Sequence, residues 1–433
     1  MASDGVVVVD EVHEQDRFVE RVAAIDVGKN ELKVCVRLPG GRSGRRRQEV
    51  RTYSSRTRSI LDLSDWLRCE QVELVVMEAT GEYWKPPFYL LEDSVECWLL
   101  DARQVKHLPG RPKTDREDAI WLARVAERGM ARPSFVPPKP IRQLRDLTRY
   151  RRALTQDRTR NKQRLEKTLE DAQIKLSSAI SDIYGVSGRA MIEALISGQR
   201  DPKVLAQLAR GSMRGKITVL EEALTGHFSD HHALICVMML STIDALSIQI
   251  KQLTTRIAEL IGPFQRRVEQ LDEITGIGRI CAQDIIAEIG VDMSVFATAA
   301  HLVSWAEFCP QVQQSGGKAP RNGATGHGDP WLASALGEAA AGAARTRSFL
   351  GERSRRIARR RGKKKALVAV GNSMLTIIWN LLSDPEAHYR DLGPDFYETH
   401  VNQRRRERTL INQLEQITGK QVTLQARPEQ PAA

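Results

Sequence analysis

Residues 72–78, with the sequence VELVVME, restrict the fold of this chain more than any other segment. A nearly unbroken apolar run of this length is typical of a strand buried on both faces of a sheet. Residues 95–100 (VECWLL) repeat the pattern after a segment with helical spacing. The two runs therefore predict the central strands of a sheet that has helices between its strands.

Further strands are expected before this pair, at 21–26, 31–38 and 48–54. Residues 58–69 have the apolar spacing of a helix, and another helix is expected at 115–128, with Gly129 as its C-terminal cap. Three strands, a helix, a strand, a helix and a strand are typical of a ribonuclease-H-type α/β sheet. The rest of the chain indicates helices, so the expected fold class is α/β plus α.

The proline-rich segment 132–140 (RPSFVPPKP) predicts a linker. After it, residues 141–176 contain no Gly or Pro and carry leucines at helical separations, which predicts a long, arginine-rich helix. A second long helix, 231–261, would complete a coiled-coil hairpin, with smaller helices near 187–225. The alternative is a charged helix that is solvated and binds nothing. The predicted parts are a disordered segment 1–20, a sheet domain 21–131, the linker, a coiled-coil domain 141–265, a helical domain 266–385 and a C-terminal helix and tail 386–433.

The charge of the chain favours a polyanionic partner. Its 433 residues include 65 Lys and Arg against 54 Asp and Glu, a formal charge of +11. The alternative is a basic protein without such a partner. Six scattered cysteines and an acidic N-terminus without a long apolar run predict a cytoplasmic protein, with no membrane partner.

Four carboxylates are candidates for a metal site. Thr114 and Glu117 fit a capping box, and an acidic first turn also stabilises a helix, so helix capping alone is one explanation of the acids there. Asp115 and Asp118 lie three apart, on one side of that helix. Asp26 and Glu78 end two apolar strands, where burial of a carboxylate is costly unless something positive holds it. Oxygen ligands of this kind suit Mg²⁺, and two such ions can clamp a phosphoryl transfer.

The segments AAIDVGKN, VVMEATGEYW and PKTDREDAIWLARV resemble the motifs of the DEDD transposases of the insertion sequence 110 family. The resemblance implies a RuvC-like first domain in which Asp26, Glu78, Asp115 and Asp118 bind the metals. Lys29 and Lys113 match the basic residues beside these acids.

Two further motifs lie in residues 271–383. LDEITGIGRICAQDIIAEIG, 271–290, has the pattern of a helix-hairpin-helix whose Gly276 and Gly278 would let a phosphate approach; a simple tight turn is the alternative. Pro310 to Gly316 are similar to the family's P-x-x-x-x-S-G motif, which implies that Ser315 is the nucleophile. Ala333 stands where the family commonly has an arginine, which leaves Lys318 and Arg321 as candidates to support the phosphate.

The resemblance implies a transposase or recombinase that exchanges DNA strands through a covalent phosphoserine link, with two Mg²⁺ ions per site. It also implies a tetramer built as two dimers, donor and target DNA, a structured bridge RNA, and a bacterial, nucleoid-associated location. The expected nucleic-acid-binding residues are Lys29, Lys113, Arg149, Arg151, Arg152, Gly276, Gly278, Lys318, Arg321, Arg359, Arg360, Lys363 and Lys364. Two other functions remain open: a RuvC-like nuclease that uses water, and a non-catalytic nucleic-acid-binding protein.

Overall fold

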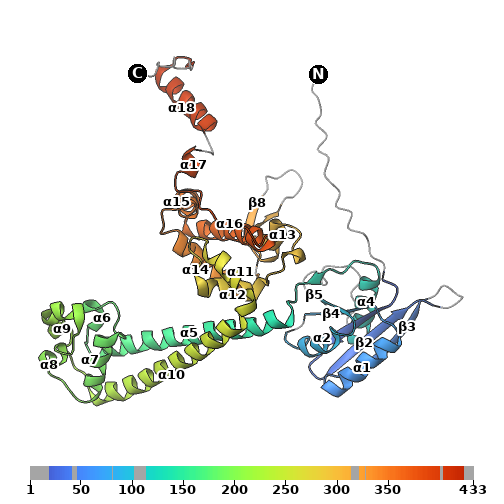
Figure 1. Cartoon of the computed structure of the whole chain (residues 1–433), viewed down its shortest axis with the longest axis horizontal. Coiled ribbons are helices and arrows are strands. Elements are labelled where there is room, and N and C mark those ends of the chain that lie inside the picture. Colours follow the sequence, from blue (N-terminus) through green and yellow to red (C-terminus); the bar gives the residue numbers. More distant parts are fainter. Residues whose placement is uncertain are drawn as a thin grey trace. The chain divides into compact units, whose positions relative to one another are not determined.

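A computed structural model describes residues 19–40, 46–79, 81–101, 114–313, 321–326, 328–399 and 403–423 (Figure 1). The chain forms two compact units, Met1–Val136 and Pro137–Ala433. The boundary between the two units falls inside the proline-rich segment 132–140, which the sequence predicts as a linker.

The first unit is built on a mixed sheet of six strands in the order β3-β2-β1-β4-β5-β6. The strands are β1 (Val22–Val27), β2 (Glu31–Leu38), β3 (Arg47–Ser54), β4 (Leu74–Glu78), β5 (Glu96–Leu100) and β6 (Pro133–Ser134). Strands β1, β4 and β5 are parallel, and the other pairs are antiparallel. The α/β sheet predicted from the sequence is confirmed, and β4 is one of its central strands. The short strand β6 was not predicted, because it lies in the proline-rich segment.

Helices cover both faces of this sheet (Figure 1). Helices α1 (Thr57–Cys69) and α2 (Lys85–Leu91) pack in one cluster with Ile25 and Met77. Helix α4 (Asp115–Glu127) packs in the other cluster, with Ala24 and Val76. Because successive side chains of a strand point to opposite faces, this division fixes which strand residues face α4.

Two long helices begin the second unit. Helix α5 (Lys139–Asp171) and helix α10 (Asp230–Leu260) lie along each other and cover most of the ranges in which the sequence predicts long helices. At their far end, α6 (Leu176–Ala179), α7 (Val186–Ile196), α8 (Pro202–Ala206), η1 (Gly211–Lys216) and α9 (Ile217–Ala223) share an apolar core with them.

The rest of the second unit is mostly helical. It contains η2 (Gly262–Phe264), α11 (Gln265–Asp272), α12 (Arg279–Ile289), η3 (Met293–Val295), α13 (Ala299–Trp305), α14 (Pro330–Ala343), α15 (Phe349–Arg361), α16 (Lys363–Ser383), α17 (Phe396–Thr399) and α18 (Gln403–Thr418). Helix α16 packs against α11, α13, α14 and α15. A hairpin of β7 (Pro310–Gln313) and β8 (Arg321–Thr325) lies where the sequence indicates only an irregular, glycine-rich segment.

Two of the described helices, α10 and α16, are long and apolar enough to cross a membrane by length and composition. This is weak evidence for a membrane span, because the core helices of soluble proteins pass the same test. Of the apolar stretch, 44% is buried in α16 and 22% in α10.

Candidate metal centre and nucleic-acid interface

The predicted metal acids Asp26 and Glu78 lie at the ends of neighbouring parallel strands. Ile25 of β1 pairs with Met77 of β4, and Asp26 and Glu78 are the next residues of the two strands. Asp26 shares its face of the sheet with Ala24, and Glu78 shares its face with Val76, because side chains alternate along a strand. Both acids therefore belong to the face that α4 covers, and both side chains are half-buried.

The other two predicted ligands lie in the first turn of α4. The Thr114 hydroxyl caps the helix by accepting a hydrogen bond from the Glu117 backbone N–H at 3.4 Å, which agrees with the predicted capping role. Asp118 is half-buried, next to Ala119, which packs on the sheet. The same helix thus places its acidic first turn against the face to which Asp26 and Glu78 belong.

The structure leaves the complete ligand set untested. The Asp115 side chain and all of Lys113 lie outside the described residues. Among the side chains that the structure does describe, no group of three or more His, Cys, Asp or Glu could hold a metal ion. Asp26 and Glu78 therefore share a face and an end of the sheet, while the joint coordination of a metal by all four acids stays a prediction. Lys29 is exposed in the turn that follows β1.

Ser315 and Lys318 lie outside the described residues, in the connection from β7 to β8. Arg321 begins β8, and its side chain is also outside them. The base of this hairpin rests on the turn after α13, where Glu307 has a φ of +58°. A side chain at Gly326 would collide with the Glu307 carboxylate, and one at Gly328 would collide with the Ala306 backbone. Glycine at these two positions thus allows the chain to pass close to that turn.

The two glycines of the predicted helix-hairpin-helix lie between α11 and α12. Gly276 has a φ of +97°, and an added side chain there would collide with the backbone of α14. Its presence is explained by close packing on α14. Gly278 caps the N-terminus of α12 with open space around its α-carbon, so it alone of the two has room for a ligand.

Comparison with protein families gives two matches. Residues 23–174 match a family model described as a transposase, the DEDD domain of IS110 elements, and residues 268–356 match one described as the transposase IS116/IS110/IS902 family. The chain belongs to the IS110 family of transposases. It is an enzyme that acts on DNA. No curated protein matches the chain.

Three arginines for which nucleic-acid contacts were predicted are held by acids inside the transposase. Arg149 donates two hydrogen bonds to Glu288, at 2.8 and 2.7 Å, and one to Asp329 at 3.0 Å. Arg151 is 4% exposed and donates to Gln283 and Asp284. Arg152 bonds with Ser334, Asp284 and Glu338. In this structure these side chains join α5 to α12 and α14, and their predicted contact with nucleic-acid phosphates stays a prediction.

Glu288 is the acid that sequence reasoning missed. It is 2% exposed and contacts both Arg149 and Arg145, the latter at 3.1 Å. Burial raises the pKa of Glu288 to about 7, although the hydrogen bond from Arg149 lowers it. The available sequence signal was the spacing: two acids, Asp284 and Glu288, lie four apart on a mostly apolar helix and oppose arginines on α5 that also lie three and four apart.

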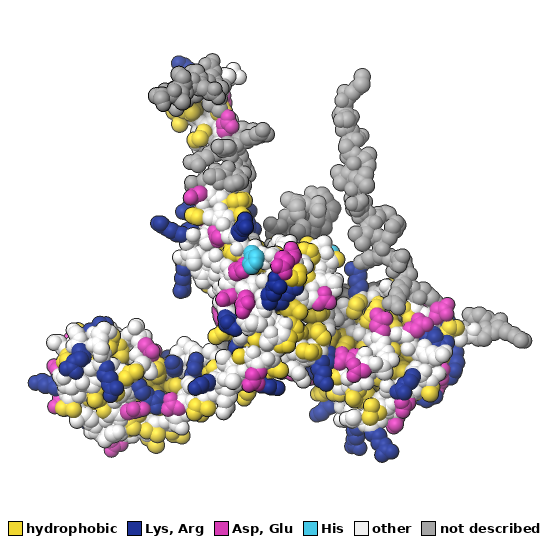
Figure 2. Space-filling model, viewed as in Figure 1, with side chains coloured by type: hydrophobic (Ala, Val, Ile, Leu, Met, Phe, Trp, Pro, Cys, Tyr) yellow, Lys and Arg dark blue, Asp and Glu magenta, His cyan; other side chains and the backbone are white. Residues whose placement is uncertain are grey.

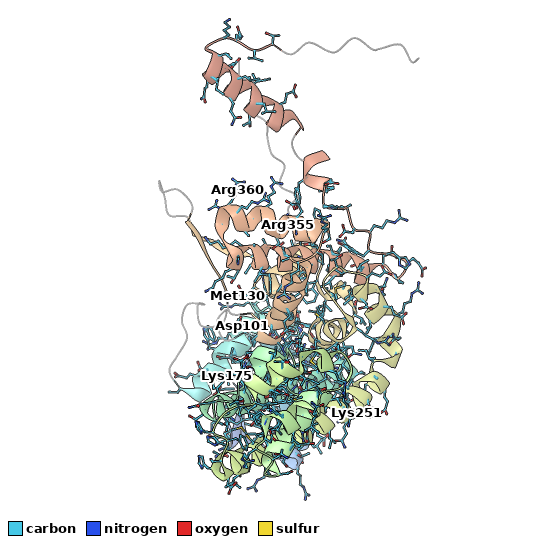
Figure 3. All side chains as sticks on the ribbon, turned by 90° about the vertical axis from the view of Figure 1, so that its left-hand side faces the viewer. Asp101, Met130, Lys175, Lys251, Arg355 and Arg360 are labelled. Atoms are coloured by element: carbon cyan, nitrogen blue, oxygen red, sulfur yellow. The ribbon has the colours of Figure 1, made fainter. Side chains whose placement is uncertain are left out.

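A second basic segment of the transposase is exposed. Arg359 and Arg360 end α15, and Lys363 and Lys364 begin α16, with Gly362 between them at a φ of +86°. All four predicted side chains are exposed, as are Arg361 and Lys365. Figure 3 labels Arg360 near the end of α15, and Figure 2 shows Lys and Arg side chains spread over several elements.

Proposed function

We propose that this transposase cuts and rejoins DNA with a metal site formed by Asp26, Glu78, Asp115 and Asp118 and with Ser315 as nucleophile. The proposed metal site rests on the common face of the sheet: Asp26 and Glu78 end adjacent strands β1 and β4 on the face that α4 covers. The proposed role of Ser315 as nucleophile rests on the resemblance around Pro310 to Gly316.

The donor set fits magnesium. All four proposed ligands are carboxylates, and Mg²⁺ prefers oxygen ligands and keeps open positions for phosphate oxygens. Carboxylates at the ends of buried strands also need a cation nearby to offset the cost of their charge. Bound there, two Mg²⁺ ions would polarise the scissile phosphate and stabilise charge on the leaving oxygen.

The residues of the chain would then perform a reversible exchange. The Ser315 hydroxyl loses its proton and forms a bond from Oγ to the phosphorus, while the bond from phosphorus to the leaving DNA oxygen breaks. That oxygen takes up a proton and becomes a free DNA hydroxyl. In the reverse step, the hydroxyl of a partner strand displaces Ser315, so the phosphodiester bond is restored without hydrolysis.

The exposed segment around Gly362 is the best-supported nucleic-acid interface among the described residues. Lysines at the N-terminus of α16 lie at the positive end of the helix dipole, which is unfavourable for them. A bound phosphate would offset this cost, because it would accept from the lysines and from the free N–H groups of the first turn. We propose that these side chains hold phosphates of DNA or of a guiding bridge RNA, within a tetramer that acts in the cytoplasm, at the nucleoid.

Replacement of the serine separates a recombinase from a water-using nuclease. Ser315→Ala is expected to abolish the covalent protein–DNA adduct, detected by gel shift after denaturation, together with strand cleavage. The exposed Ser304→Ala on α13 is the matched control and should leave both unchanged. Continued cutting by Ser315→Ala would show that water is the nucleophile.

Replacement of an acid tests the metal site. Asp26→Asn and Asp118→Asn should each remove strand cleavage while the protein keeps its affinity for the proposed bridge RNA. Asp62→Asn, an exposed acid on α1, is the control. Equal loss of cleavage and RNA binding in the two site variants would contradict a separate catalytic role for these acids.

A further inference from the structure

Helix α10 carries two rows of mostly apolar side chains, here called seams, and only one of them is covered by α5. Seven positions at alternating separations of four and three face α5: Cys236, Leu240, Ile243, Ser247, Ile250, Thr254 and Ile257. A second series with the same separations begins at Leu234 and continues through Met238, Ser241, Ala245, Ile248, Gln252 and Thr255, all exposed. The two series are offset by two residues, about 200° around a helix, so they lie on nearly opposite sides.

The uncovered seam is unusual for a surface that only meets water. Leu234 and Met238 are each 64% exposed and Ile248 is 60% exposed. From 231 to 250 the single Asp, Glu, Lys or Arg is Asp244, and Arg189 holds its carboxylate through two hydrogen bonds of 2.9 and 2.7 Å. A face with so few charges does not suit nucleic-acid phosphates, and a contiguous exposed apolar seam generally marks an interaction surface.

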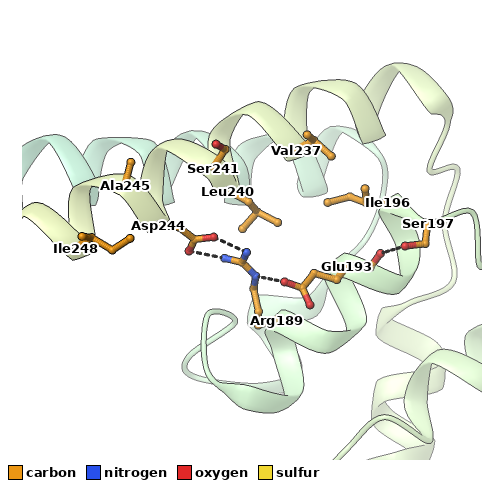
Figure 4. Close-up of a pocket in the computed structure, with 10 residues that line it drawn as sticks. All are labelled: Arg189, Glu193, Ile196, Ser197, Val237, Leu240, Ser241, Asp244, Ala245 and Ile248. Carbon is orange, nitrogen blue, oxygen red and sulfur yellow. Dashed lines mark hydrogen bonds and ion pairs between the residues drawn. The ribbon is translucent and has the colours of Figure 1, made fainter.

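A groove runs beside this seam. It has a volume of about 530 Å³ and lies between α7 and α10, where Ile196 lies near Val237 (Figure 4). The Arg189 ion pairs with Asp244 and Glu193 cross one side of it. A helix laid along the seam would therefore meet α10 directly and α7 on its flank.

We propose that the seam pairs with the same seam of a second copy of this chain, antiparallel, about a two-fold axis near Ser241. In that register Leu234 opposes Ile248 of the second copy, and Met238 opposes Ala245 of the second copy. Apolar side chains thus meet apolar ones, the long Met238 meets the small Ala245, and the small Ser241 at the axis permits close approach of the two helices. A two-fold interface requires such self-complementarity, since each residue meets its counterpart in both directions.

The area is sufficient for association. The seam from 234 to 255 is roughly 30 Å long at about 1.5 Å per residue. Two helices in contact over that length, with α7 on the flank, bury on the order of 1,000 Å² in total, which is the lower bound for a specific interface. The pairing thus supplies one association step of an oligomer, whatever other surfaces add.

Cross-linking tests the register. In a Cys69→Ser background, which removes the native exposed thiol, the full-length chain with Ser241→Cys should form a disulfide-linked dimer under mild oxidation. Gln252→Cys should not, because its two copies would be about 30 Å apart in the antiparallel arrangement. Equal cross-linking at 252 would indicate a parallel pair, and no cross-linking at 241 would indicate that this surface does not pair; either result overturns the proposal.

Sedimentation of the full-length protein tests whether a second copy of the chain covers the seam. Leu234→Glu combined with Ile248→Glu should weaken self-association at least tenfold and leave the unfolding temperature unchanged, since both side chains are exposed. The matched control is Leu410→Glu with Leu414→Glu, two exposed leucines of α18 at 50% and 48%, which should keep the wild-type association. An unchanged Leu234→Glu/Ile248→Glu assembly would overturn the proposal. So would weaker self-association of the Leu410→Glu/Leu414→Glu variant alone, which would assign the contact between copies to α18.

Discussion

Two arginine-rich segments of the transposase look alike in sequence and differ in structure. On α5, Arg149, Arg151 and Arg152 lie against acids of α12 and α14, and Arg151 is 4% exposed. At the junction of α15 and α16, the six basic residues around Gly362 are exposed. The first segment joins parts of the protein, whereas the second is available to a polyanion. Charge density along a sequence therefore does not identify a nucleic-acid surface. Whether basic side chains stay available to a polyanion depends on whether a facing helix carries acids that pair with them.

The largest effect on stability is expected from Arg151→Ala. The change leaves the half-buried Asp284 without its 2.6 Å partner and with Arg152 at 3.6 Å, and loss of one member of a buried ion pair typically costs about 3–5 kcal/mol. Arg160→Ala, on the same helix but in an exposed pair with Asp157, should cost less than about 1 kcal/mol. Chemical denaturation of both variants gives the comparison, and equal, small losses would show that the α5 arginines are not structural.

A smaller effect is expected from pH through Glu288. Its pKa is raised by burial to about 7, above its ordinary value of 4.5, so the folded state binds the proton more tightly than the unfolded state. This contribution to stability is complete below about pH 4.5 and is lost as the pH rises through 7.

Unfolding of the wild type and of Glu288→Gln at pH 5 and pH 8 measures this contribution. The free energy of unfolding of the variant minus that of the wild type should increase from pH 5 to pH 8, by up to a few kcal/mol. An unchanged difference between the two pH values would mean that Arg149 and Arg145 keep the carboxylate ionised in both states.

The smallest effect on stability, and a large one on binding, is expected from Arg359→Ala, Arg360→Ala, Lys363→Ala and Lys364→Ala together. The side chains are exposed, so the unfolding midpoint should hardly change. If each holds one phosphate, the slope of log affinity for duplex DNA against log salt should become shallower by roughly 3–4. Arg266→Ala with Arg256→Ala, exposed arginines elsewhere in the unit, controls for net charge. An unchanged slope would remove this segment from the interface.

The sheet could be predicted because its signal is local. The apolar run that became β4 and the alternation in β2 indicate strands without knowledge of their partners. The location of Asp26 and Glu78 at neighbouring strand ends followed from the same pattern, since parallel strands end at a common edge.

The arginines of α5 could not be assigned in the same way. Their partner Glu288 lies 139 residues from Arg149, and the matching spacing of acids and arginines on the two helices does not say that these helices meet. The hairpin of β7 and β8 was missed for a different reason: its strands have only four and five residues, too few for a clear alternation, and a glycine interrupts β8.

The close passage of Gly326 and Gly328 over the turn at Glu307 has a practical meaning for engineering. After β8 the chain passes close to this turn at both glycines. A variant that exchanges residues 314–320 should therefore retain Gly326 and Gly328, so that the end of β8 keeps its contact with the turn at Glu307.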